Sequence, residues 1–109
     1  MMVSLDRSLW HASLQRVSTR ERGTLVTVRY QESRGEPGLV AIWRLPLVEI
    51  FLNEGGLLVI TAGEEFPVTF HGSTPARLRV KATPDRQHLQ RLRIEFQDGS
   101  ATTVEFVHE

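Results

Sequence analysis

Apolar residues near the start of the chain recur with the spacing of one face of an α-helix. The stripe consists of five residues: Leu5, Leu9, Trp10, Leu14 and Val17. This pattern predicts a helix from about residue 7 to residue 18 that buries Trp10 in the core. Asp6 stands just before the first turn, where a carboxylate can accept a hydrogen bond from a free backbone N–H, so we expect it to cap the helix.

Residues from about 24 to 108 instead show the alternation of β-strands. Residues 25–31, for example, place two valines and a tyrosine at one parity. Polar segments rich in glycine and proline separate the apolar ones and mark turns. Pro46 has no N–H to donate to a sheet, so we expect a bend or an edge position between strands at 39–44 and 47–53.

The segments 47–53 and 57–61 are apolar at both parities, unlike the strand at 25–31. Strands of this kind are usually covered on both faces. We expect the N-terminal helix to cover one face and the interior of a curved sheet to cover the other. The stretch from Asn53 to Gly56 has the composition of a hairpin turn between them.

The apolar faces of the last two strands occupy even-numbered positions: Leu92, Ile94 and Phe96 in one, and Thr102, Val104 and Phe106 in the other. Residues directly opposite each other share a face of the sheet. The loop that joins these strands must therefore contain an odd number of residues. We predict a three-residue loop with Gly99 in the left-handed region of backbone conformation.

These elements predict a single domain spanning residues 1–109, with the helix at about 7–18 and β structure at about 24–108. A chain of 109 residues has the length of one domain. The expected fold class is mainly antiparallel β (α+β), with about seven strands in a strongly curved sheet or small barrel. A β-sandwich of two sheets is the alternative.

The composition excludes several kinds of chemistry and several kinds of binding partner. Thirteen basic residues balance thirteen acidic ones, so the overall charge gives no attraction to nucleic acid or to an anionic membrane. There is no cysteine, which excludes disulfides and cysteine-ligated zinc. The first ten residues lack an apolar run of secretory length, and no segment approaches the ~20 apolar residues of a membrane span. We therefore expect a cytoplasmic protein without a membrane partner.

No residue pattern indicates catalysis. The four histidines are His11, His71, His88 and His108, and none stands three or four positions from another, as two ligands on one helix would. Phosphate-binding glycine motifs and nucleophile elbows are also absent. We therefore expect no catalytic residue, metal ion or cofactor. If the interior of the sheet holds a ligand, Tyr30, His71 and His108 are the candidates for its pocket.

Charge is segregated along the chain. Residues 46–75 contain four glutamates and no Lys or Arg, whereas residues 76–94 are rich in basic side chains. Five of these would share an outward strand face: Arg77, Arg79, Lys81, Arg91 and Arg93. Such a face is a candidate for binding an anion or a protein partner. Glu95 and Glu105 would neutralise part of it, and the inward parity of the nearby aromatic residues disfavours nucleic acid.

Two features of the sequence are candidates for an interface with a partner. Trp43 shares a strand face with other apolar residues next to Pro46. We expect it to be buried, but an exposed tryptophan here would mark an interface. The opposite charges of the two halves could also pair two copies of the chain, so the candidate partners are a second copy or another protein.

Five motifs follow one another at characteristic distances: Leu9–Trp10, Gly23–Val28, Leu45–Ile50, Leu92–Phe96 and Asp98–Phe106. Their order and spacing resemble a family of short bacterial proteins that is catalogued only as a domain of unknown function. The resemblance covers nearly the whole chain. It implies a bacterial origin and a stand-alone domain of this length, and it carries no activity or functional residues over to this chain.

The leading interpretation is a non-catalytic binding or interaction module of a bacterial cell, because no catalytic set accompanies the segregated charges and the central hairpin. Two alternatives stay open at this point. One is a small enzyme or ligand carrier that uses the barrel interior, and the other is a weak nucleic-acid binder that uses the Arg-rich face.

Overall fold

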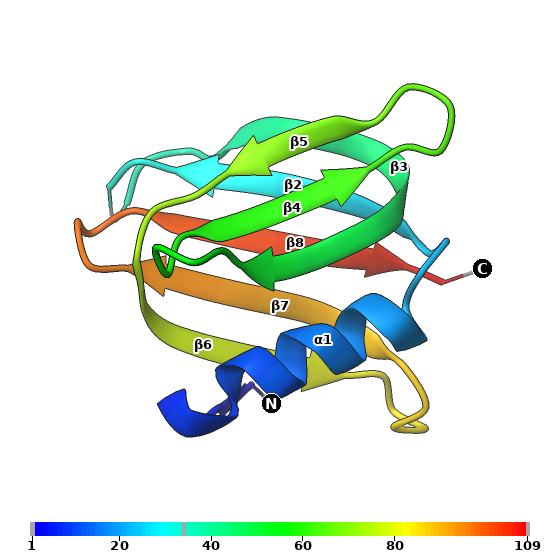
Figure 1. Ribbon diagram of the computed structural model, residues 1–109, viewed down its shortest axis with the longest axis horizontal. Helices are drawn as coiled ribbons and strands as arrows, with labels where there is room; N and C mark the ends of the chain where they lie inside the picture. Colours follow the sequence, from blue (N-terminus) through cyan, green and yellow to red (C-terminus); the bar gives the residue numbers. More distant parts are fainter. Residues whose placement is uncertain (1, 34, 109) are drawn as a thin grey trace.

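The computed structural model describes residues 2–33 and 35–108 (Figure 1). Its N-terminal part comprises β1 (Val3–Ser4), a 3₁₀ turn (Arg7–Leu9) and α1 (Trp10–Arg20). The strands that follow are β2 (Leu25–Gln31), β3 (Leu39–Leu52), β4 (Leu58–Ala62), β5 (Val68–His71), β6 (Pro75–Ala82), β7 (Leu89–Phe96) and β8 (Ala101–Val107). The prediction of a mainly antiparallel β fold with one N-terminal helix is confirmed.

The eight strands form one sheet in the order β1-β6-β7-β8-β2-β3-β4-β5. The end strands β1 and β5 do not pair with each other in the described part of the chain, so the sheet is strongly bent but not closed as a barrel. The sheet has eight strands instead of about seven, and two of the expected strand assignments differ. The segments 39–44 and 47–53 belong to the single strand β3, and the two-residue β1 is an additional strand.

The bend of the sheet lies in β3. Its first half pairs with β2 as far as the pair Leu25–Pro46, and its second half pairs with β4 from the pair Leu47–Ala62 onward. Pro46 therefore stands where β3 exchanges partners, and its missing N–H is tolerated there. The expected bend at Pro46 is confirmed, although the strand is continuous. Beyond this point the sheet folds back, so that β3, β4 and β5 face the layer of β2, β8 and β7 (Figure 1).

The register of the last hairpin agrees with the prediction from parity. Ile94 is paired with Thr102, and Leu92 is paired with Val104, so the even positions share one face. The N–H of Phe96 donates to the carbonyl of Ser100 at 2.9 Å. This leaves a three-residue loop in which Gly99 has a φ of 89°.

Inward-facing side chains of both layers fill the space between them. The core contains side chains that are at most 3% exposed from β2, β3, β4, β6, β7 and β8: Val26, Val28, Ile42, Leu47, Ile50, Leu58, Ile60, Ala62, Leu78, Leu92, Ile94, Phe96 and Val104. Trp10, Leu14 and Val17 join this core from α1, so the predicted burial of Trp10 is confirmed.

The helix begins and ends close to its predicted limits. Asp6 accepts a hydrogen bond from the N–H of Ser8 at 3.0 Å, which confirms it as the cap of the 3₁₀ turn that leads into α1. We expected the helix to cover one face of the segments 47–53 and 57–61. Instead, α1 packs along the edge of β3 that has no strand partner among residues 2–33 and 35–108. There the Ser18 hydroxyl accepts from the N–H of Ile50 and donates to its carbonyl, both at 2.8 Å. Backbone groups on an unpaired strand edge need such partners.

The Ser18→Ala substitution should lower the free energy of unfolding by about 1–3 kcal/mol, because it leaves the N–H and the carbonyl of Ile50 without their side-chain partner. Thr19→Ala is a matched control, since the Thr19 hydroxyl bonds only the carbonyl of Gln15 within the exposed helix surface. Urea denaturation measures both. Equal effects of the two substitutions would contradict the role assigned to Ser18.

Candidate functional site

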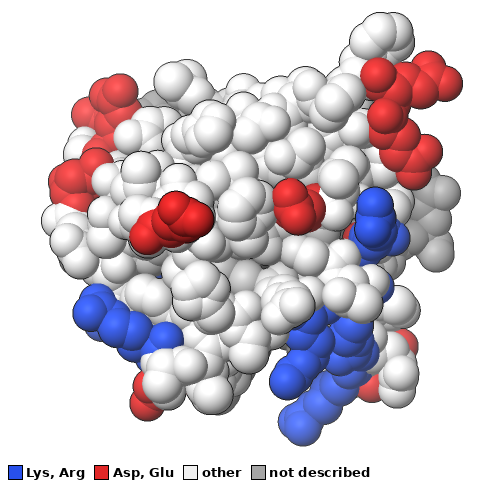
Figure 2. Space-filling model, in the orientation of Figure 1, with Lys and Arg blue, Asp and Glu red and all other residues white. Residues whose placement is uncertain are grey.

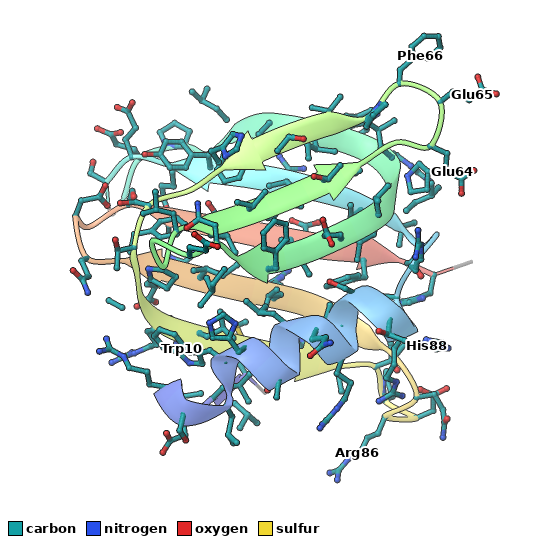
Figure 3. The ribbon with its side chains drawn as sticks, viewed as in Figure 1. Trp10, Glu64, Glu65, Phe66, Arg86 and His88 are labelled. Atoms are coloured by element: carbon teal, nitrogen blue, oxygen red, sulfur yellow. The ribbon has the colours of Figure 1, made fainter. Side chains whose placement is uncertain are left out.

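Three ionisable side chains meet at one end of the molecule. Glu21 follows α1, His88 precedes β7 and His108 follows β8. Each offers one ligand atom, and these three atoms lie within 4.8 Å of one another. We call this group the carboxylate–histidine cluster. Figure 3 labels His88 beside the C-terminal end of α1.

The carboxylate of Glu21 is almost completely buried, with 2% of its side chain exposed. A buried carboxylate must be hydrogen-bonded to be tolerated. Its Oε1 accepts from the N–H of Leu89 at 3.0 Å and from Nδ1 of His88 at 3.3 Å. Its Oε2 accepts from the Thr24 hydroxyl at 3.2 Å. These bonds tie the end of α1 to the start of β7.

The two histidines meet because β7 and β8 are neighbours. Their register pairs Arg91 with Glu105, and extending it by three residues places His88 opposite His108. The two imidazole centroids are 4.8 Å apart. Nε2 of His108 donates to the carbonyl of Leu89 at 2.6 Å and lies 3.9 Å from Oε2 of Glu21. A carbonyl oxygen only accepts, so this nitrogen carries a proton here.

The cluster borders a hollow of about 680 Å³ between the ends of β2 and β8 and the β6–β7 loop. His88 and His108 line it, together with Thr83 and Asp85 of the loop. The hydroxyl of Thr83 and the N–H of Gln87 donate to Asp85 and hold the pKa of its carboxyl below the usual range. This end of the molecule thus presents two imidazoles beside ionised or ionisable carboxyl groups, a set that can bind a cation.

The pocket residues proposed from the sequence lie in different places. Tyr30 is paired with Thr102 at the far end of β8, with its ring centroid 5.9 Å from that of Phe70. His71 is exposed on the edge strand β5. His108 alone belongs to the cluster. The distance from residue 102 to residue 108 along an extended strand is roughly 20 Å, so Tyr30 and His108 do not share a pocket.

Sequence reasoning missed Glu21 and His88. The signal for the histidine pair was nevertheless present, because the register that aligns Ile94 with Thr102 also aligns His88 with His108. No such signal existed for Glu21, whose approach to the histidines depends on how α1 packs against the sheet.

The predicted basic residues share the outer face of β6 and β7. Arg79 stands opposite Arg93, and Lys81 stands opposite Arg91, while Arg77 stands opposite Glu95. The carboxylate of Glu95 accepts from Arg79 and, at 3.4 Å, from Arg93. The expected partial neutralisation by glutamate is therefore present on this face, and a further pair joins Arg29 to Glu105 at 3.3 Å.

The pH dependence of stability should show the contribution of Glu95. Burial acts to raise the pKa of this carboxyl, but the hydrogen bonds and charges of Arg79 and Arg93 outweigh it and hold the pKa below 4.5. The carboxylate therefore adds stability above the unfolded pKa of about 4.5, and this addition is lost as the pH falls through the lower folded pKa. Glu95→Gln should cost about 1 kcal/mol of unfolding free energy at pH 7, and this cost should become smaller as the pH falls below 4.5.

Thermal unfolding across pH 3–7 measures this difference. Glu54→Gln, in the exposed β3–β4 turn, is the matched control and should have little effect at any pH. A Glu95→Gln deficit that stays constant down to pH 3 would contradict the assignment.

Trp43 is exposed, with 61% of its surface accessible, and the expectation that it is buried is wrong. The cause is a bulge in β3. Val26 is paired with Leu45 and Val28 with Ile42, so two residues of β3 oppose one residue of β2. Arg44 in this bulge has a φ of 49°. The extra residue breaks the alternation on which the expectation rested and leaves the indole on the outer surface.

The segregation of charge seen along the chain is also visible on the surface. On the face shown in Figure 2, basic side chains lie in the lower half and most acidic ones in the upper half. Glu64 and Glu65 project from the β4–β5 loop next to Phe66, which is 84% exposed (Figure 3).

No known protein family, curated protein or solved structure matches this chain. The resemblance to a bacterial family stays a prediction. Within residues 2–33 and 35–108, none of the helices has the length and apolar character required to span a membrane.

Proposed function

We propose that this chain is a binding module whose site is the carboxylate–histidine cluster, and that its ligand is a divalent transition-metal ion of the Zn²⁺ class. The observation that carries this proposal is the convergence of Glu21, His88 and His108 from three separate elements onto one point. Two imidazoles and one carboxylate form a known ligand set for Zn²⁺.

The distances support this ligand set. In a tetrahedral zinc site with bonds of about 2.0–2.1 Å, neighbouring ligand atoms are roughly 3.3 Å apart. Glu21 Oε1 and His88 Nδ1 are already separated by 3.3 Å. Nε2 of His108 lies 3.9 Å from the other carboxylate oxygen, Oε2, and the three ligand atoms lie within 4.8 Å of one another, so the His108 imidazole would have to rotate toward a shared ligand oxygen to complete the set.

Metal binding would exchange existing hydrogen bonds for coordinate bonds. Nδ1 of His88 now donates to Glu21, and Nε2 of His108 donates to the carbonyl of Leu89. Both nitrogens must present a lone pair to a metal, so each imidazole would have to carry its proton on the other ring nitrogen when the metal is bound. The exposed sides of both rings, 52% and 27% accessible, give an ion a path to the site.

The interior of the sheet supports a binding site less well than this end of the molecule. Most inward positions between the layers hold buried apolar side chains, which offer no charge to a polar ligand. The cluster instead lies at the surface beside the hollow of about 680 Å³. Three protein ligands leave the fourth position of a tetrahedral ion for water or for another molecule.

Zinc titration of the metal-free protein tests the proposal. We expect one equivalent to bind with a dissociation constant of about 1 µM or below. At a free zinc concentration one hundred times the dissociation constant, binding should add about 2.7 kcal/mol to the free energy of unfolding. His88→Ala and His108→Ala should each weaken binding by roughly tenfold or more, as measured by calorimetry and by thermal shift.

His11 and His71 provide matched controls, because both are exposed histidines outside the cluster. Their alanine variants should bind zinc within a factor of about two of the wild type. The proposal is wrong if the wild type binds no zinc, or if the cluster variants retain affinity that the His11 or His71 variants lose.

A further inference from the structure

A second, smaller hollow is bordered by His88 and Glu21 and lies between α1 and the start of β7. Its volume is about 220 Å³. Part of its lining is apolar and comes from five residues around the end of the core: Leu5, Val17, Val80, Ala82 and Leu89. Leu5, Val80 and Leu89 are only half-buried, so apolar surface is available to a ligand.

Three arginines border the same hollow. Arg16 and Arg20 come from α1, and Arg86 comes from the β6–β7 loop, where it has a φ of 60°. In the described part of the chain none of the three lies within ion-pair distance of a carboxylate. Figure 2 shows basic side chains gathered at the lower right, where Figure 1 has the end of α1 and the β6–β7 loop.

The helix dipole accounts for only part of this arrangement. Cations at the C-terminal end of a helix are favoured by its dipole, which explains Arg20 in the last turn of α1. Arg86 belongs to a different element and still borders the same hollow. The carboxylate of Glu21, which forms one wall, is already bonded to Leu89, Thr24 and His88, so its oxygens are engaged away from the guanidinium groups.

We infer that this hollow binds a small amphipathic carboxylate, with its apolar chain on the half-buried leucines and valine and its anionic group on Arg16 and Arg86. Arg20 already donates to the carbonyl of Gln87 at 2.7 Å, which holds the loop against the helix. Guanidinium groups match the geometry of a carboxylate. A volume of 220 Å³ equals that of roughly seven water molecules, which suits a ligand the size of hexanoate. This inference does not depend on the metal site.

Titration of metal-free, ¹⁵N-labelled protein with hexanoate tests the inference. We expect saturable shifts in the amide resonances of Arg86, Val80 and Leu89. Hexanamide has the same size without the charge, and acetate has the charge without the chain. Each should bind at least about tenfold more weakly than hexanoate, because each loses one of the two kinds of contact.

Variants assign the charge to particular residues. Arg16→Gln and Arg86→Gln should each weaken hexanoate binding by roughly tenfold. Arg22→Gln is the matched control, since Arg22 is also near the end of α1 but borders other hollows, and it should change the affinity by less than about twofold. This control separates ligand recognition from a general effect of the helix dipole.

Three results would overturn the inference: no saturable shift with hexanoate, equal affinity for hexanoate and hexanamide, or wild-type affinity in the Arg86→Gln variant. Because the protein is free of metal, a failure of zinc binding leaves this titration unaffected. Conversely, zinc binding without hexanoate binding would remove only the carboxylate site.

Discussion

The other features of the structure depend on one constraint: the bent sheet leaves one edge of β3 without a strand partner among the described residues. Since β3 exchanges β2 for β4 at Pro46, its second half keeps one unpaired edge. The apolar stripe of α1 covers the adjoining opening, and Ser18 satisfies the exposed backbone of Ile50. A helix laid along this edge ends where β7 begins and β8 ends (Figure 1). The location of the carboxylate–histidine cluster follows from that geometry.

Glu21 connects the stability of the fold with the proposed site. Burying a carboxylate costs several kcal/mol unless hydrogen bonds compensate, and this one receives bonds from Leu89, Thr24 and His88. The same oxygens that hold α1 to β7 are the ones that would coordinate a metal ion. Substituting Glu21 would therefore change both folding and binding, whereas the partly exposed histidines can be replaced with less disturbance of the fold.

Most of the fold could be predicted from periodicity because local side-chain spacing reports directly on helix and strand faces. The even-numbered faces of β7 and β8 identified the loop around Gly99 correctly. This reasoning fails at Trp43. A one-residue bulge moves its side chain to the opposite face of the sheet, and the amino-acid composition does not reveal such a bulge. The packing of α1 along the edge of β3 could not be predicted either, because it depends on the path of β3 after Pro46.

Only part of the candidate site could be predicted from the sequence. Strand register brings His88 and His108 together, and this could have been derived from the same parity argument. Glu21 is separated from His88 by 67 positions and reaches it through tertiary packing alone. The guanidinium group of Arg86 shares a hollow with α1 for the same reason. Charge segregation along the chain therefore indicated basic regions without showing which arginines surround one hollow.

The two proposed sites, which both include His88, would bind opposite charges: a cation beside the imidazoles and an anion beside the arginines. The central claim is that the cluster holds the cation. Anomalous diffraction at the zinc absorption edge, from crystals grown with one equivalent of Zn²⁺, tests it most directly. The account predicts one strong peak within about 2.0–2.2 Å of ligand atoms from Glu21, His88 and His108. Peaks only at other histidines, with the His108–Leu89 hydrogen bond intact, would contradict it.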